Sequence, residues 1–152
     1  MCSSDLSSTT SGSAATGISN GAAWAGLFEL QRTGDDTSGR DFDRTRRMGV
    51  NTLAFRGPQH RAFFDLDADC APITPQLPWE LAARWLDLLA RSGTALFVSP
   101  DPAAVNTESK QALRRAFAVA AQVRELAEPL DWMDTTAPGR WRIVLKRNRG
   151  LI

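Results

Sequence analysis

The sequence predicts an α/β fold in which parallel strands alternate with helices. Three short apolar runs, at residues 27–31, 63–67 and 94–98, have the composition of strands. Their starting points are 36 and 31 residues apart. Each interval suffices for one strand, one crossover helix and a return to the same sheet. We therefore expect a parallel sheet three strands wide, with helices between the strands.

Composition and charge exclude several classes of protein. The 18 Lys and Arg residues nearly balance the 17 Asp and Glu residues, so the net charge of +1 gives no electrostatic argument for a nucleic-acid or membrane partner. No stretch approaches the roughly 18 uninterrupted apolar residues of a membrane span. Two cysteines are too few for a disulfide scaffold or a structural zinc cluster. We expect a globular domain with no nucleic-acid or membrane partner and no cofactor.

The two ends of the chain differ from its middle. Residues 1–17 are mainly Ser, Thr, Gly and Ala, which cannot bury enough surface to offset their ordering entropy, so we expect a disordered tail. The opening Met1–Leu6 resembles a translated sequencing adaptor, so the native chain is expected to begin upstream and Cys2 to be an artefact. We assign residues 18–130 to the α/β domain and residues 131–152 to a linker.

The first half of the domain shows two strand patterns around one helix pattern. The run Leu27–Gln31 ends at Arg32 and precedes a loop rich in helix and strand breakers over residues 33–39. Apolar residues then recur at helical spacing from Asp41 to about Phe55. The next strand pattern is Phe63–Asp67.

The second half begins with the clearest helix pattern in the chain. An apolar stripe starts at Trp79, Pro78 suits the first turn because its missing N–H would be unpaired there, and Ser92-Gly93 ends the helix. The run Thr94–Val98 is typical of a strand buried on both faces. A further helix is expected from Thr107 to Val123.

Polar residues follow each predicted strand. The three segments are Arg32–Asp36, Asp67–Cys70 and Ser99–Asp101. In parallel α/β folds the loops that leave the carboxyl ends of the strands build the site, so these segments predict one. The structural alternative is that Asp, Ser and Gly are ordinary loop formers and helix caps.

The sequence contains few residues that could support most catalytic mechanisms. His60 is the only histidine, so a Ser-His-Asp triad would depend on it alone, and no glycine-rich phosphate loop occurs. Asp67 and Asp69 are two residues apart but lack a third ligand at matching spacing, so no metal is expected. Paired carboxylates from different strand ends remain, and this pattern points to glycoside hydrolysis.

Three stretches of the chain resemble α-galactosidase-like glycoside hydrolases, the melibiase clan. The stretch Arg32-Thr-Gly-Asp-Asp36-Thr is similar to the strand-six motif, in which an Arg lies four residues before the acid/base Asp. The stretch His60–Cys70 is similar to the aromatic, Asn-Asp-Pro-Asp-Cys segment of strand seven. Residues 79–99, which end in Ala-Leu-Phe-Val-Ser, are similar to the helix and strand eight that follow. The resemblance runs from about residue 26 to residue 123 and implies the last three βα units of a (β/α)8 (TIM) barrel.

The resemblance also implies roles for individual residues. Asp36 becomes the general acid/base, with the adjacent Asp35 as the alternative. Arg32 becomes a group that contacts the substrate or positions the acid. The strand-seven loop supplies further substrate-binding residues, namely Asp67, Asp69 and Cys70. The chain departs from the motif at Leu66 and Ala68, where the clan has Asn and Pro.

The clan's nucleophile, an Asp in a Lys-x-Asp context on strand four, has no counterpart here, because neither Lys110 nor Lys146 is followed by this pattern. The resemblance therefore implies a fragment of a retaining glycosidase that acts on α-galactosides or similar glycosides. Residues 141–145 would start a C-terminal β domain. The chain alone is expected to be inactive and poorly behaved, because a three-stranded excerpt of a barrel exposes two sheet edges. The alternative is a barrel fragment without catalysis that binds carbohydrate or acts as a scaffold.

Overall fold

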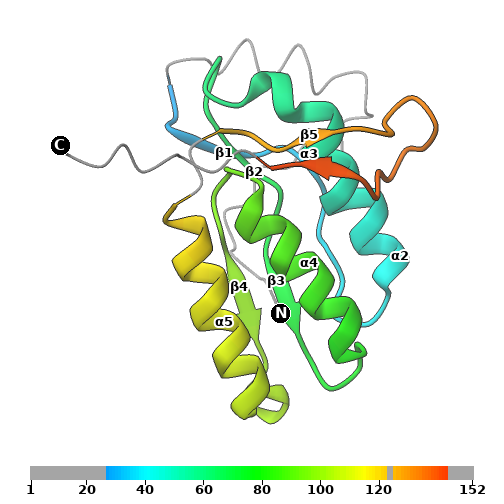
Figure 1. Ribbon diagram of the computed structural model, residues 1–152, viewed down its shortest axis with the longest axis vertical. Coiled ribbons are helices and arrows are strands. Elements are labelled where there is room, and N and C mark those ends of the chain that lie inside the picture. The colour runs from blue at the N-terminus through cyan, green and yellow to red at the C-terminus, as the bar shows by residue number, and fades with distance from the viewer. Residues whose placement is uncertain (1–26, 123–124, 144–152) are drawn as a thin grey trace, which may run out of the picture.

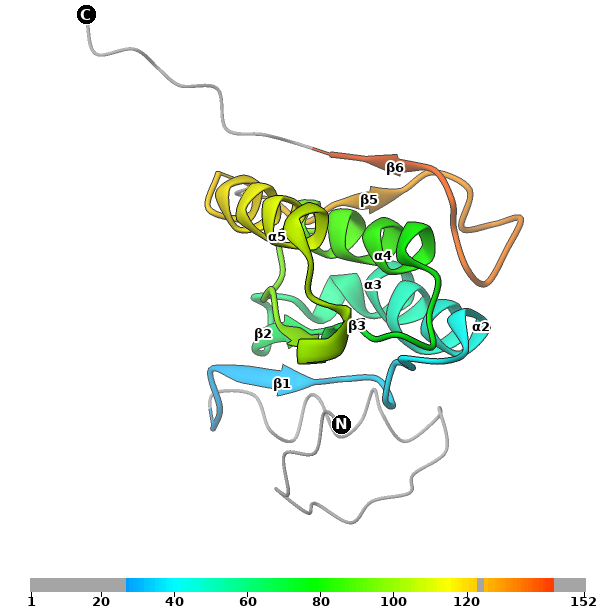
Figure 2. The ribbon, with the colours of Figure 1, turned by 90° about the horizontal axis from the view of Figure 1, so that it is seen from below.

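The computed structural model describes residues 27–122 and 125–143. Short parallel strands lie on one side of a layer of helices, and an antiparallel hairpin lies on the other side (Figures 1 and 2). The predicted mixture of helices and parallel strands is thus confirmed. The strands form pairs and do not close into a barrel within the described residues.

The parallel strands form two pairs that share one stretch of chain. Strand β1 (Leu30–Arg32) pairs with β2 (Asp65–Asp67), and β3 (Ala71–Ile73) pairs with β4 (Val98–Pro100). Only three residues separate β2 from β3. The stretch from residue 65 to residue 73, called the middle segment below, therefore pairs first with β1 and then with β4. The parallel pairing of β1 with β2 agrees with the spacing, but the expected sheet three strands wide is wrong, because β4 pairs with β3, a strand that the apolar runs did not predict.

The strands are shorter than the apolar runs predicted, and β4 starts four residues later than expected. Asp69, between β2 and β3, has a φ of 73°, which lies in the left-handed region and interrupts the extended backbone. The chain before β4 still follows the middle segment, because the Ala95 N–H donates to the Leu66 carbonyl and the Ala71 N–H donates to the Phe97 carbonyl.

The helix predicted over residues 41–55 is present, with a local irregularity. It comprises α2 (Phe42–Thr45), a π-helical turn (Arg46–Val50) and α3 (Asn51–Arg56). Asp41 caps its start by accepting a hydrogen bond from the Asp43 N–H. Gly49 lies in the π-helical turn against the Trp85 ring, where a β-carbon would collide with the indole.

The other two long helices also lie where the pattern placed them. Helix α4 (Trp79–Arg91) starts at the expected residue, although Pro78 is the N-cap and lies just before the first turn. It ends at Ser92, and Gly93 follows with a φ of 83°, against the backbone of Glu125. Helix α5 (Thr107–Ala120) begins with a capping box between Asn106 and Ser109. Val123, the expected end of α5, lies outside the described residues.

The segment predicted as a linker folds back onto the helices. Strands β5 (Glu128–Pro129) and β6 (Trp141–Arg142) form the antiparallel hairpin. Trp141 and Ala137 pack against the hydrophobic core, and the Asn51 side chain donates a hydrogen bond to the Thr136 carbonyl. Of the strand expected at residues 141–145, the last two residues lie outside the described residues.

The core lies between the helices and one face of the strands. Its fully buried side chains include Leu66 of β2, Trp85, Leu86 and Leu89 of α4, and Leu53 of α3. Because side chains alternate along a strand, the neighbours of Leu66 point to the opposite face, which none of the described helices covers (Figure 2). Leu30 and Phe97 are both more than 40% exposed.

Trp85 connects this core to the strands, and its loss should cost stability. The ring is 1% exposed, and its Nε1–H donates to the Cys70 carbonyl at 3.0 Å. Replacing Trp85 with Phe removes this hydrogen bond and leaves a cavity, so the free energy of unfolding should fall by about 2–3 kcal/mol. The measurement is urea unfolding followed by circular dichroism.

Trp132, which is 50% exposed, provides the matched control. The Trp132→Phe variant should unfold within about 0.5 kcal/mol of the wild type. Equal losses from both substitutions would contradict the placement of Trp85 in the core.

Candidate functional site

Two of the three predicted polar segments meet at the ends of β1 and β2. Arg32 and Asp67 are direct partners in the parallel register, so both side chains lie on the face that the helices leave uncovered. The Thr33 N–H donates to the Asp67 carbonyl at 3.2 Å and extends the pairing by one residue. The loop after β1 therefore starts beside the segment that follows β2.

Asp69 holds the loop after β1 against the middle segment through hydrogen bonds. Its side chain is only 6% exposed, and its Oδ2 accepts hydrogen bonds from the Thr37 N–H at 2.7 Å and the Thr37 hydroxyl at 2.8 Å. Its Oδ1 lies 3.4 Å from Nη1 of Arg32. Since both carboxylate oxygens have protein partners, this geometry suits a residue that positions the loop.

Arg32 joins the carboxylates of two segments. Its Nη2 lies 2.7 Å from Oδ1 of Asp36, while its Nη1 reaches Asp69. The Arg32 side chain is 36% exposed and the Asp36 side chain 52%, so the pair is open to solvent. Asp36 is thereby held beside the strand ends, where a ligand can reach it.

Asp35 is oriented away from Arg32. Its carboxylate accepts the Asp36 N–H at 2.8 Å and a hydrogen bond from Nη2 of Arg44 at 3.0 Å. The Nε–H of Arg44 also donates to the Asp36 carbonyl at 2.9 Å. Of the two adjacent acids, Asp36 contacts the strand residues and Asp35 contacts the helical segment that starts with α2.

Asp67 is the half-buried acid of the cluster. Burial is the main cause that raises the pKa of its carboxyl above the ordinary value of 3.8, and the charge of Asp69 raises it further. The Asp69 N–H, which donates to Oδ1 of Asp67 at 2.8 Å, and the Arg32 guanidinium both act in the opposite direction. The net shift is upward, so the surroundings make Asp67 a weaker acid than an exposed aspartate.

The remaining predicted residues have structural positions. Cys70 is 5% exposed, and its carbonyl accepts hydrogen bonds from the Thr37 hydroxyl and the Trp85 indole. Ser99 lies within β4, and Asp101 caps a short 3-10 helix (Pro102–Ala104) by accepting the Ala103 N–H. The third polar segment, Ser99–Asp101, therefore fits the structural alternative, in which such residues are ordinary loop formers and helix caps.

His60 also has a structural role here. Its Nδ1 accepts the Leu66 N–H at 3.0 Å, and burial lowers the pKa of the imidazole, which favours the neutral ring. Among the residues that the structure describes, no group of three or more His, Cys, Asp or Glu side chains could hold a metal ion. Within the same residues, no helix is long and apolar enough to cross a membrane.

Thr37 is a member of the cluster that the sequence motifs did not identify. It directly follows Asp36 and supplies two of the hydrogen bonds that hold Asp69. Its place next to the motif was the one available signal, since Thr is common in loops for many other reasons.

Comparisons with protein-family models, with curated proteins and with solved structures gave no match. The function proposed below therefore rests on the geometry of the Arg32 cluster (Arg32, Asp36, Thr37, Asp67 and Asp69) and on the sequence motifs.

The raised pKa of Asp67 predicts a specific pH dependence of stability. The folded state binds this proton more tightly than the unfolded state, so protonation stabilises the fold. As the pH rises from the ordinary value through the raised pKa, the contribution of Asp67 to the free energy of unfolding should fall. The Asp67→Asn variant cannot lose this proton. Its free energy of unfolding should therefore rise relative to that of the wild type across that pH interval.

Urea unfolding of both proteins at a series of pH values measures the difference. A difference that stays constant with pH would show that burial does not favour the protonated form of Asp67. The carbon-13 chemical shift of the Asp67 carboxyl, followed by NMR, gives the direction of the pKa shift directly.

Proposed function

We propose that the Arg32 cluster is the acid–base half of a retaining glycosidase site that acts on α-galactosides or similar glycosides. The observation that carries the proposal is a half-buried carboxyl with a raised pKa, Asp67, at the end of a parallel strand. An Arg-paired carboxylate, Asp36, lies on the neighbouring loop. Glycoside hydrolysis needs a carboxyl that can give a proton to the leaving oxygen, and the Arg32 cluster contains two candidates for this role.

We further propose that the strands are a section of a (β/α)8 barrel. Two features support this reading: the strands pair in parallel, and the helices cover one face only. In such a barrel the uncovered face would be the interior, and the ends of β1 and β2 would lie at the mouth where active sites form.

Two carboxyls compete for the role of acid/base. The resemblance assigns this role to Asp36, which would protonate the leaving oxygen and later activate water. The surroundings favour Asp67, because burial favours its neutral form. In both assignments Arg32 orients the Asp36 carboxylate, and Asp69 and Thr37 fix the loop.

A carbohydrate-binding function without catalysis is the second candidate. Leu66 and Ala68 occupy the positions of Asn and Pro in the resembled motif, and both are buried in the core with at most 1% exposure. The segment therefore lacks the side-chain amide that the motif carries at the position of Leu66. The binding function predicts that a sugar occupies the cluster without any bond cleavage.

Chemical rescue separates the two functions. The chain lacks the Lys-x-Asp nucleophile motif, so we expect no hydrolysis of phenyl α-galactoside in plain buffer. Azide can take the nucleophile's place: it attacks the anomeric carbon, the bond to the phenolic oxygen breaks, and the acid of the cluster protonates that oxygen. We expect phenol and β-galactosyl azide as products.

The acid/base variant should lose about a hundredfold or more of this rescued rate. A dinitrophenyl α-galactoside is the control substrate, because its leaving group needs no proton and its cleavage should be little changed. Loss in Asp36→Asn alone assigns the role to Asp36, and loss in Asp67→Asn alone assigns it to Asp67. Asp65→Asn, on the exposed side of β2, is the control variant.

Methyl α-galactoside binding, followed by amide NMR shifts at Arg32 and Asp67, tests the second candidate. Binding without rescued cleavage would contradict the enzyme and support the binding protein. The absence of both binding and cleavage would contradict both proposals.

A further inference from the structure

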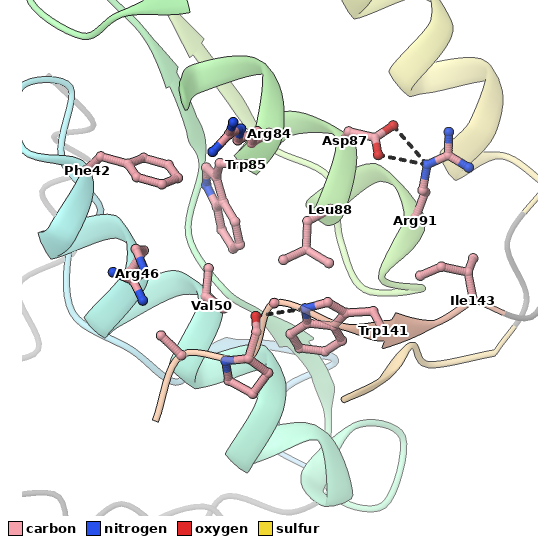
Figure 3. Close-up of a pocket in the computed structure, with 13 residues that line it drawn as sticks. Phe42, Arg46, Val50, Arg84, Trp85, Asp87, Leu88, Arg91, Trp141 and Ile143 are labelled. Carbon is pink, nitrogen blue, oxygen red and sulfur yellow. Dashed lines mark hydrogen bonds and ion pairs between the residues drawn. The ribbon is translucent and has the colours of Figure 1, made fainter. Parts of the chain in front are cut away.

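A hollow lies on the helical side of the molecule, away from the Arg32 cluster. It has a volume of about 600 Å³ and lies between α2 with its π-helical turn, α4 and residues 137–143 (Figure 3). This volume falls within the range of small-molecule sites. None of its lining residues belongs to the Arg32 cluster, so the inference does not depend on the proposed glycosidase function.

The middle of the hollow is apolar and aromatic. Trp85, Leu88 and Trp141 lie there, and Val50 lies below Trp85 in Figure 3. Trp141 is fixed by a hydrogen bond from its Nε1–H to the Pro138 carbonyl at 3.0 Å. Because Trp85 is buried, the apolar contact for a flat ligand comes from Leu88 and the indole ring of Trp141, which are only partly buried.

The two ends of the hollow differ in charge. At one end Asp87 and Arg91 neutralise each other, because the Nε of Arg91 lies 2.8 and 2.9 Å from the two carboxylate oxygens. At the other end Arg46 and Arg84 flank Phe42. This second end has two guanidinium groups and no carboxylate among the lining residues.

The guanidinium groups of Arg46 and Arg84 have N–H donors available for a ligand. Arg84 makes no ion pair or hydrogen bond with any residue in the part of the chain that the structure describes. Among the described residues Arg46 forms its one ion pair with Asp43, at 3.3 Å, and both side chains are about half or more exposed, which makes the pair weak. An incoming anion would therefore have to displace only the weak ion pair between Arg46 and Asp43.

We propose that this hollow binds a small organic anion with a flat apolar body, such as an aromatic sulfonate or carboxylate. The body lies against Leu88 and Trp141, and the anionic group accepts hydrogen bonds from Arg84 and Arg46. Guanidinium groups suit this role because they present paired N–H donors to planar or tetrahedral oxyanions. A neutral ligand would gain only the apolar half of these contacts.

The probe for the test is 8-anilinonaphthalene-1-sulfonate, whose fluorescence increases on transfer from water to an apolar site. N-phenyl-1-naphthylamine, the same ring system without the sulfonate, is the neutral counterpart. Arg84→Met should weaken sulfonate binding about fivefold or more, since it removes a charge-assisted contact. The same substitution should leave binding of the neutral probe unchanged.

Arg114→Met provides the matched control, because Arg114 is an exposed arginine of α5 that does not line the hollow. It should change sulfonate binding by less than about twofold. Circular dichroism melting checks that both variants remain folded, as expected for exposed side chains.

The position of the probe is checked by NMR of the tryptophan indole N–H groups. That of Trp141 should shift on addition of the sulfonate, while that of Trp132, in the exposed loop between β5 and β6, should not. Equal weakening by Arg84→Met and Arg114→Met would contradict the proposal. So would shifts confined to the uncovered face around Phe97, which is also apolar and exposed.

Discussion

The buried carboxylate of Asp69 is the contact on which the rest of this structure depends. Its backbone is left-handed, which divides the middle segment into β2 and β3 and lets one stretch of chain pair first with β1 and then with β4. Its side chain binds Thr37 and Arg32, so the loop that carries Asp36 is held against the segment that carries Asp67. One residue thus determines both the strand pairing and the composition of the Arg32 cluster.

The sequence predicted the helices better than the strands, for a physical reason. A helix such as α4 leaves a long periodic signal with capping residues at both ends, and its start at Trp79 was predicted correctly. Each strand here pairs over two or three residues, and the left-handed backbone at Asp69 leaves no trace in an apolar pattern. The apolar runs therefore located β1, β2 and β4 but overestimated their lengths, placed the start of β4 too early and missed β3.

The site was predictable as a region and not in its details. The rule that polar loops gather at the carboxyl ends of parallel strands correctly grouped Arg32–Asp36 with Asp67–Cys70. Which acid is buried depends on how the loop folds back through Thr37, and this is a tertiary contact. The arginine-rimmed hollow was not predicted at all, because its lining comes from three segments that are far apart in the sequence.

A double-mutant cycle between Thr37 and Asp69 tests the central role of this contact most directly. Thr37→Val removes one hydrogen-bond donor, Asp69→Asn removes the charge while keeping a side chain that tolerates the left-handed backbone, and the double variant completes the cycle. The free energies of unfolding should show a coupling of about 1 kcal/mol or more, because the two side chains lie in direct contact. Losses that simply add, within about 0.3 kcal/mol, would contradict the account.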